Sequence, residues 1–199
     1  MTAPLEISWS RIADWLRSNR PELTPMLGTA ASIEAILETE ATIGGRLPET
    51  MRESYLLQDG FPYGEQELPI LPGHASEGSG YCLLPIEGVA EEWTIWKDLI
   101  DDGTFKGETS QPDAGITDRW WSDAWIPIGG NGAGDLLCID LQPAEGGTVG
   151  QVIEAIHDDD DRKLLAASWP AYLETLADGL TSGRVVYDDE IGLIWDDAT

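Results

Sequence analysis

The chain has 199 residues, 42% of them hydrophobic, and 37 acidic residues against 11 Lys and Arg give it a formal net charge of −26. The apolar content predicts a single globular domain over residues 1–199, and the acidity excludes recognition of a nucleic-acid backbone, which needs a basic face. No apolar run approaches the ~18 residues of a membrane span, and residues 1–7 lack the basic start of a secretory signal, so we expect a cytoplasmic protein.

Apolar residues recur at helical spacing in the first part of the chain. A first helix is expected to begin at a Ser8 cap and to end before Pro21. A second helix is expected from Thr29, and Gly44-Gly45 should stop it. The apolar stripe of this second helix consists of Ile33, Ile36, Leu37 and Ile43.

One carboxylate, Glu40, lies on the same stripe. A carboxylate that faces a core needs hydrogen-bond partners, and the backbone amides of the turn over residues 44–47 can supply them. We therefore interpret Glu40 as a structural clamp, with a catalytic acid as the alternative. Leu47 and Pro48 then begin a third helix, which is expected to run to about Gln58.

The middle of the chain is less regular. Residues 61–80 are rich in Gly, Pro, Glu and Ser and are expected to form an irregular loop, followed by a strand over 81–84 and a helix from Pro85 to about Asp102. Residues 104–121 are expected to form a polar connector. Two cysteines, Cys82 and Cys138, each lie in an apolar strand-like run, which predicts buried free thiols.

Residues 125–141 contain two β-type runs around a glycine-rich loop. A phosphate-binding loop would end in Lys and Ser or Thr before a helix, and a dinucleotide fingerprint would need glycine where Asp135 stands. The segment instead predicts a β-hairpin that needs positive φ at several positions. The motif residues of this loop are Gly130, Asn131, Gly132, Gly134 and Asp135.

The last part of the chain predicts a strand over 150–157, a helix capped by Ser168, and one or two edge strands over 184–195. Between the first two lie four adjacent carboxylates: Asp158, Asp159, Asp160 and Asp161. They lack the glycine and glutamate that an EF-hand requires, so a solvated turn is expected, with weak cation binding as the alternative. No Cys or His lies at zinc spacing, and neither a metal nor a cofactor is expected.

Several short motifs, taken in order, resemble the SUKH superfamily, which includes fungal cell-wall assembly regulators and many bacterial toxin-immunity proteins. The matching pieces are Trp9…Trp15-Leu16, Ile36…Glu40…Ile43-Gly44…Leu47-Pro48, Tyr55…Asp59-Gly60, residues 128–140 and Trp169…Tyr172-Leu173. The resemblance implies an α+β domain with a central, mostly antiparallel sheet flanked by helices. It places the core at about residues 9–180, with 184–199 as an extension, and implies protein binding without catalytic residues.

From this resemblance and the net charge we expect an immunity protein that occludes the basic substrate-binding surface of a toxin, possibly a nuclease. The alternative is a regulatory or scaffold protein like the fungal regulators, and an enzyme with a hidden carboxylate pair is the third reading. The expected contact residues are Asp101, Asp102, Glu108, Asp113 and Asp118 beside Trp120 and Trp121, with Asp158 to Asp161 as a second patch. Core packing is the alternative role of the tryptophan pair.

Overall fold

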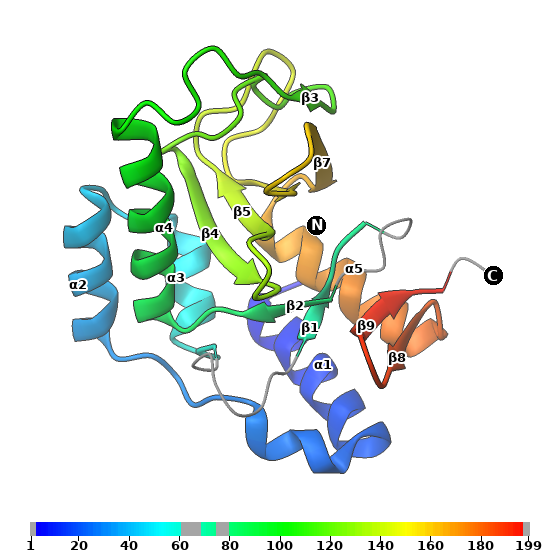
Figure 1. Cartoon of the computed structure of the whole chain (residues 1–199). Helices are drawn as coiled ribbons and strands as arrows, with labels where there is room; N and C mark the ends of the chain where they lie inside the picture. Colours follow the sequence, from blue (N-terminus) through cyan, green and yellow to red (C-terminus); the bar gives the residue numbers. More distant parts are fainter. Residues whose placement is uncertain (1–2, 61–68, 75–79, 197–199) are drawn as a thin grey trace.

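The computed structural model describes residues 3–60, 69–74 and 80–196 (Figure 1). Its helices are α1 (Leu5–Asn19), the 3₁₀ helix η1 (Pro21–Met26), α2 (Ile33–Ile43), α3 (Glu49–Tyr55), α4 (Ile86–Asp101) and α5 (Trp169–Ser182). Its strands are β1 (Pro69–Pro72), β2 (Gly80–Leu83), β3 (Gln111–Pro112), β4 (Trp125–Gly130), β5 (Leu136–Asp140), β6 (Gln151–Ala155), β7 (Asp161–Ala166), β8 (Val185–Asp188) and β9 (Gly192–Trp195). Within the described residues, no helix combines the length and apolarity that a membrane span requires.

Seven strands form one sheet in the order β1-β2-β4-β5-β6-β7-β3. Every neighbouring pair is antiparallel except β3 and β7, which are parallel. Helices flank this sheet, so the predicted α+β fold with a mostly antiparallel sheet is confirmed (Figure 1). Strands β8 and β9 form a separate hairpin.

The central strands separate two hydrophobic cores, because successive side chains of a strand point to opposite faces. On β5, Leu137 and Ile139 belong to the larger core, whereas Leu136 and Cys138 belong to the smaller one. The larger core is covered by α1, α3, α5 and the start of α4 and is mainly aliphatic. The smaller core is covered by the end of α4 and by residues 103–124, and three of its buried residues are the tryptophans Trp96, Trp121 and Trp125. Both cysteines are buried, as predicted, and neither forms a disulfide.

Two helix predictions need correction. Helix α1 begins at Leu5 after Pro4, so Ser8 lies inside the helix, fully buried, and caps nothing. Helix α2 begins at Ile33 with the Ser32 hydroxyl accepting from Ala35 N, and of the predicted stripe only Ile36 is buried. Ile33 is 61% exposed and Leu37 53% exposed, because α2 packs against its neighbours through a narrow face.

Three strands escaped sequence prediction. Strand β1 lies within the expected 61–80 loop; the rest of that prediction, over 61–68 and 75–79, falls outside the described residues. Two prolines bound β1, which conceals it, since proline is rare in strands. Strand β3 interrupts the 104–121 connector, and β7 starts at the last of the four adjacent aspartates. Strand β7 begins with three charged residues, which do not look like a strand in the sequence, and one of them, Arg162, is buried in the structure.

Arg20, which lies between α1 and η1, contacts the C-terminal β8–β9 hairpin. The Arg20 guanidinium lies 4.4 Å from the ring centroid of Tyr187 and 2.7 Å from a carboxylate oxygen of Asp189. Trp195 packs closely against Gly179 of α5, where a Cβ atom would come within 2.9 Å of the indole ring. The hairpin therefore covers the end of α5.

Candidate functional site

A row of neighbouring aromatic rings runs from the smaller core to the surface. In order the rings are Trp125, Trp121, Trp96, Phe105 and Trp120, and neighbouring centroids lie 5.4, 4.2, 5.8 and 6.5 Å apart. Trp125 is fully buried and Trp121 is 5% exposed, whereas Trp120 is half-buried. Of the tryptophan pair expected at the interface, only Trp120 thus reaches solvent, and Trp121 packs in the core.

A cavity of about 420 Å³ opens beside the outer end of this row. Its apolar lining residues are Ile100, Phe105, Trp120 and Trp121, and its charged ones are Lys106, Glu108, Arg119 and Asp123. The volume lies in the range of ligand pockets, about 300–1,000 Å³. Three of the contact residues predicted from the sequence, Glu108, Trp120 and Trp121, therefore line this cavity.

The remaining acids predicted as contact residues differ in the contacts that their side chains make within the chain. Asp101 and Asp102 end α4 and are exposed, with Asp101 paired to Lys97. The Asp118 side chain is also exposed. Asp113, in contrast, accepts a hydrogen bond from Leu164 N at 2.8 Å and so fixes the connector to β7. Asp113 thus contributes to the scaffold, although its side chain is exposed like those of the other acids.

Arg162, which sequence reasoning missed, joins the two predicted acidic patches. Its side chain is only 1% exposed, and its guanidinium donates to four backbone carbonyl oxygens at 2.6–3.1 Å. Three of these belong to the turn before β7, namely those of Ile156, Asp159 and Asp161, and the fourth belongs to Trp120. The guanidinium also lies 5.2 Å from the Trp120 ring centroid. Only its position directly after four aspartates marked it in the sequence.

The second patch therefore lies next to the first. Gln111 N donates to the Asp160 carbonyl at 2.7 Å, and the Gln111 side chain contacts the Asp160 carboxylate. A hydrogen bond from Asp161 N lowers the pKa of Asp159, and Asp161 pairs with Lys163 at 2.8 Å. Of the four aspartates, Asp158 and Asp159 are exposed. We call six of the exposed acids around the cavity and this turn the acidic platform: Asp101, Asp102, Glu108, Asp118, Asp158 and Asp159.

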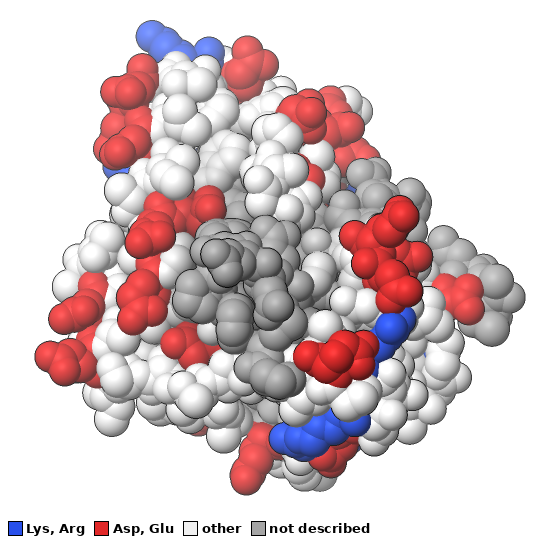
Figure 2. Space-filling view, turned by 60° about the horizontal axis from the view of Figure 1, so that its bottom comes forward, with Lys and Arg blue, Asp and Glu red and all other residues white. Residues whose placement is uncertain are grey.

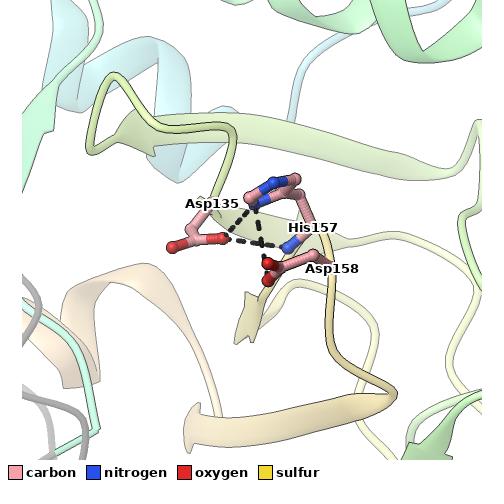
Figure 3. Close-up of side chains that lie close together, drawn as sticks. All are labelled: Asp135, His157 and Asp158. Atoms are coloured by element: carbon pink, nitrogen blue, oxygen red, sulfur yellow. Dashed lines mark hydrogen bonds and ion pairs between the residues drawn. The ribbon is translucent and has the colours of Figure 1, made fainter.

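The glycine-rich loop reaches the same turn through Asp135 (Figure 3). One Asp135 oxygen accepts from His157 N at 2.9 Å and lies 2.8 Å from His157 Nδ1, and Asp158 approaches the same ring nitrogen at 3.8 Å. Positive φ occurs at Gly132 and Gly134, where a Cβ atom on Gly134 would collide with the imidazole ring. Ligand-type atoms of Asp135, His157 and Asp158 lie within 4.8 Å of one another. Their mutual contacts hold the β4–β5 loop against the β6–β7 turn.

Glu40 lies in a different part of the molecule, between α2 and α3. Its carboxylate accepts from Leu47 N at 2.9 Å and forms an ion pair with Arg52 at 2.6 Å. Burial raises the pKa of this carboxyl, but the bonds to Arg52 and Leu47 N outweigh burial, and the net pKa is lowered. Both side chains are at least 85% buried, so the charge is closed off from solvent and serves the fold.

Acidic side chains are not confined to the platform. Figure 2 shows a face on which Asp and Glu side chains lie in several separate groups and Lys and Arg side chains are few. The combination of exposed acids with an aromatic cavity distinguishes the platform from charge alone.

Three similar proteins come from fungi. The Schizosaccharomyces pombe protein named "Cell wall biosynthesis/cell cycle regulator smi1" is 29% identical, over 94% of this chain and 38% of its own length. The "Glucan synthesis regulatory protein" of Neurospora crassa is 28% identical, over 92% and 40%. The "Cell wall assembly regulator SMI1" of Saccharomyces cerevisiae is 20% identical, over 89% and 41%. The chain thus spans about two fifths of the length of these relatives.

These names correct the expected function. The relatives are regulators of the cell wall and of glucan synthesis, so the expectation of a toxin-immunity protein is wrong and the regulatory alternative is favoured. The error has a physical origin. An excess of acidic residues favours a basic partner, but it does not distinguish a basic toxin from a basic regulatory partner. The sequence pattern of the SMI1 / KNR4 family (SUKH-1) matches residues 30–175. Because this match covers most of the chain, the chain belongs to that family.

Proposed function

We propose that this chain is a non-enzymatic regulatory module that acts by binding a protein partner in the control of cell-wall synthesis. The observation that carries the proposal is the extent of the matches: they take in 89–94% of this chain but only 38–41% of each regulator. The chain thus corresponds to a portion that the three regulators share. Within it, residues 9–180 form the module and 184–199 an extension.

Binding explains the candidate site better than catalysis does. None of the described residues that line the cavity is a Ser, Cys or His, the side chains that most often act as nucleophile or general base. The other charged groups nearby, Arg162 and Asp113, are held by backbone hydrogen bonds. Half-buried aromatic residues surrounded by charge are instead typical of binding hot spots.

The platform also favours a basic partner. The net charge of −26 and the exposed carboxylates around the cavity create a field that attracts cationic surfaces and accelerates encounter. Two buried cysteines that form no disulfide fit a reducing compartment, so we place this encounter inside the cell.

Affinity capture with matched variants tests this function. The platform variant carries Asp101→Asn, Asp102→Asn, Glu108→Gln and Asp118→Asn; the control carries Glu34→Gln, Glu38→Gln, Glu53→Gln and Glu190→Gln, exposed residues that remove the same charge elsewhere. Captured proteins are identified by mass spectrometry from cells of the native host at low salt. We expect wall-synthesis or cell-cycle proteins that the control retains and the platform variant loses. Equal capture by both variants would contradict the role of the platform.

A gene-replacement experiment provides a second test of the proposed function. A fission yeast strain lacking its smi1 regulator receives that regulator with its matching portion exchanged for this chain. Restored resistance to wall-degrading enzyme is the expected result. Failure with a folded, expressed chimera would count against a shared regulatory function.

A further inference from the structure

We propose that the cavity at the end of α4 receives a bulky apolar side chain from an extended, basic segment of the partner. The inference rests on the proposed protein-binding function and names the chemistry of the segment that binds. Three features of the described residues support it: the charge at the end of α4, the composition of the cavity wall and an unpaired donor in that wall.

Helix α4 ends with charge of the wrong sign for its own stability. The carbonyl end of a helix carries a partial negative charge, and basic residues normally compensate it. The last turn of α4 has no basic residue and instead carries Asp98 and Asp101, with Asp102 as the C-cap. Lys97, which precedes this turn, pairs with Asp101. Acidic residues at the negative end of a helix lower its stability, and such a departure from the usual pattern is typical of a functional site. We infer that a cation from outside the chain binds here.

The wall of the cavity favours an apolar side chain inside it. The two bases of the lining, Lys106 and Arg119, offset its two acids, Glu108 and Asp123, so the charged lining gives no net attraction for a cation. Ile100, Phe105 and Trp120 in contrast offer apolar and aromatic surface. An apolar side chain therefore suits the interior. Its basic neighbours along the segment would lie over the carboxylates at the end of α4.

One polar atom in the wall lacks a partner. Trp121 lines the cavity, is 5% exposed, and its indole nitrogen has no hydrogen-bond acceptor among the described residues. A buried donor without an acceptor is unfavourable. Because this nitrogen has almost no exposed surface, a backbone carbonyl of a docked segment would reach it only after a shift of the cavity wall.

Fluorescence polarisation with labelled peptides tests the occupant. The probes have the sequence Gly-Ser-Lys-Lys-X-Lys-Lys-Ser-Gly, with X as Trp, Leu, Ala, Lys or Glu, and one Trp probe has Glu in place of every Lys. At 50 mM salt we expect the Trp and Leu probes to bind the full chain at least tenfold more tightly than the Ala probe. The Trp120→Ala variant should lose this preference while it still binds the Ala probe through charge.

Each other outcome overturns the inference in a specific way. Equal affinity for Trp and Ala probes means that charge alone binds, and a preference for X as Lys places a cation in the cavity. Preference for the Glu-flanked probe assigns the cavity to an acidic partner through Lys106 and Arg119. If no peptide binds while affinity capture still depends on the platform, this inference fails and the proposed function stands. If the Trp probe binds but capture is independent of the platform, the role of the platform in the proposed function fails.

The charge conflict on α4 gives an independent test with a matched control. Asp102→Asn and Glu190→Gln each remove one exposed carboxylate, the second in the β8–β9 hairpin. We expect Asp102→Asn to raise the urea midpoint of unfolding and to weaken binding of the Trp probe two- to fivefold. Glu190→Gln should leave both nearly unchanged. Equal effects of the two variants on affinity would remove the end of α4 from the interface.

Discussion

The two faces of the sheet are covered in different ways. On one face, α1, α3 and α5 pack a mainly aliphatic core whose members include Leu137 and Leu173, both fully buried. On the other, the end of α4 and an irregular segment cover a smaller core, and the aromatic row leads from there to an open cavity. The first face also has the buried Glu40–Arg52 pair nearby, whereas the second carries exposed carboxylates at its rim.

This difference separates stability from recognition. Where a carboxylate is buried and paired, as in Glu40, its charge joins two helices and is unavailable to a partner. Where carboxylates are exposed around a cavity, they add little to stability and create a field that other molecules experience. Substitutions on the two faces should therefore have opposite profiles of unfolding and binding.

The largest expected effect is that of Arg162→Met, because it removes the cation that holds the platform from beneath. Four partly buried carbonyls would lose their donor, which should lower the free energy of unfolding by about 4 kcal/mol. Urea unfolding measures this loss, and binding of the basic Trp probe should fall with it. Arg162→Lys, which keeps the charge but fewer donors, should be intermediate. If the Met variant were as stable as the original chain, the β6–β7 turn and Trp120 would not need the hydrogen bonds of Arg162 to keep their conformation.

Leu173→Ala comes next, on the closed face. A cavity in a well-packed core should lower the free energy of unfolding by about 3 kcal/mol. Affinity for the Trp probe, measured under conditions where the variant is folded, should stay within twofold of the original. A large loss of affinity in the folded variant would break the separation between the two faces.

Glu40→Gln should have a smaller effect that depends on pH. The substitution keeps an acceptor for Leu47 N but removes the charge that pairs with Arg52, which should lower stability by about 1–2 kcal/mol at pH 7. The pKa of Glu40 in the folded chain is lowered, so its stabilisation is present above the unfolded value of about 4.3 and is lost as the pH falls through the folded value. The stability difference between the two proteins should therefore shrink below about pH 4. A constant difference from pH 7 to pH 3 would mean that the charge of Glu40 contributes nothing.

Local signals in the sequence predicted much of the scaffold. The glycine-rich segment indicated the β4–β5 hairpin, and Ser168 does cap α5 through its hydroxyl. Such features depend on neighbours within a few residues of the chain. The same locality explains why Cys138 was expected in a buried strand.

Features that depend on distant segments were not predictable. The burial of Arg162 needs carbonyls from the β6–β7 turn and from Trp120, more than 40 positions away in sequence. Trp120 and Trp121 are adjacent and identical in kind, and only the tertiary packing decides which one is buried. The exposure of Ile33 and Leu37 likewise follows from how α2 packs, since helical periodicity alone favoured a buried stripe.

Hydrogen exchange of the full chain, with and without the basic Trp probe, tests the separation of the two faces most directly. We predict slower exchange in residues 99–123 and 157–163, around the cavity and the neighbouring turn, and unchanged exchange in α1, α5 and the β8–β9 hairpin. Protection centred on α1 and α5, with no change around the cavity, would contradict the account.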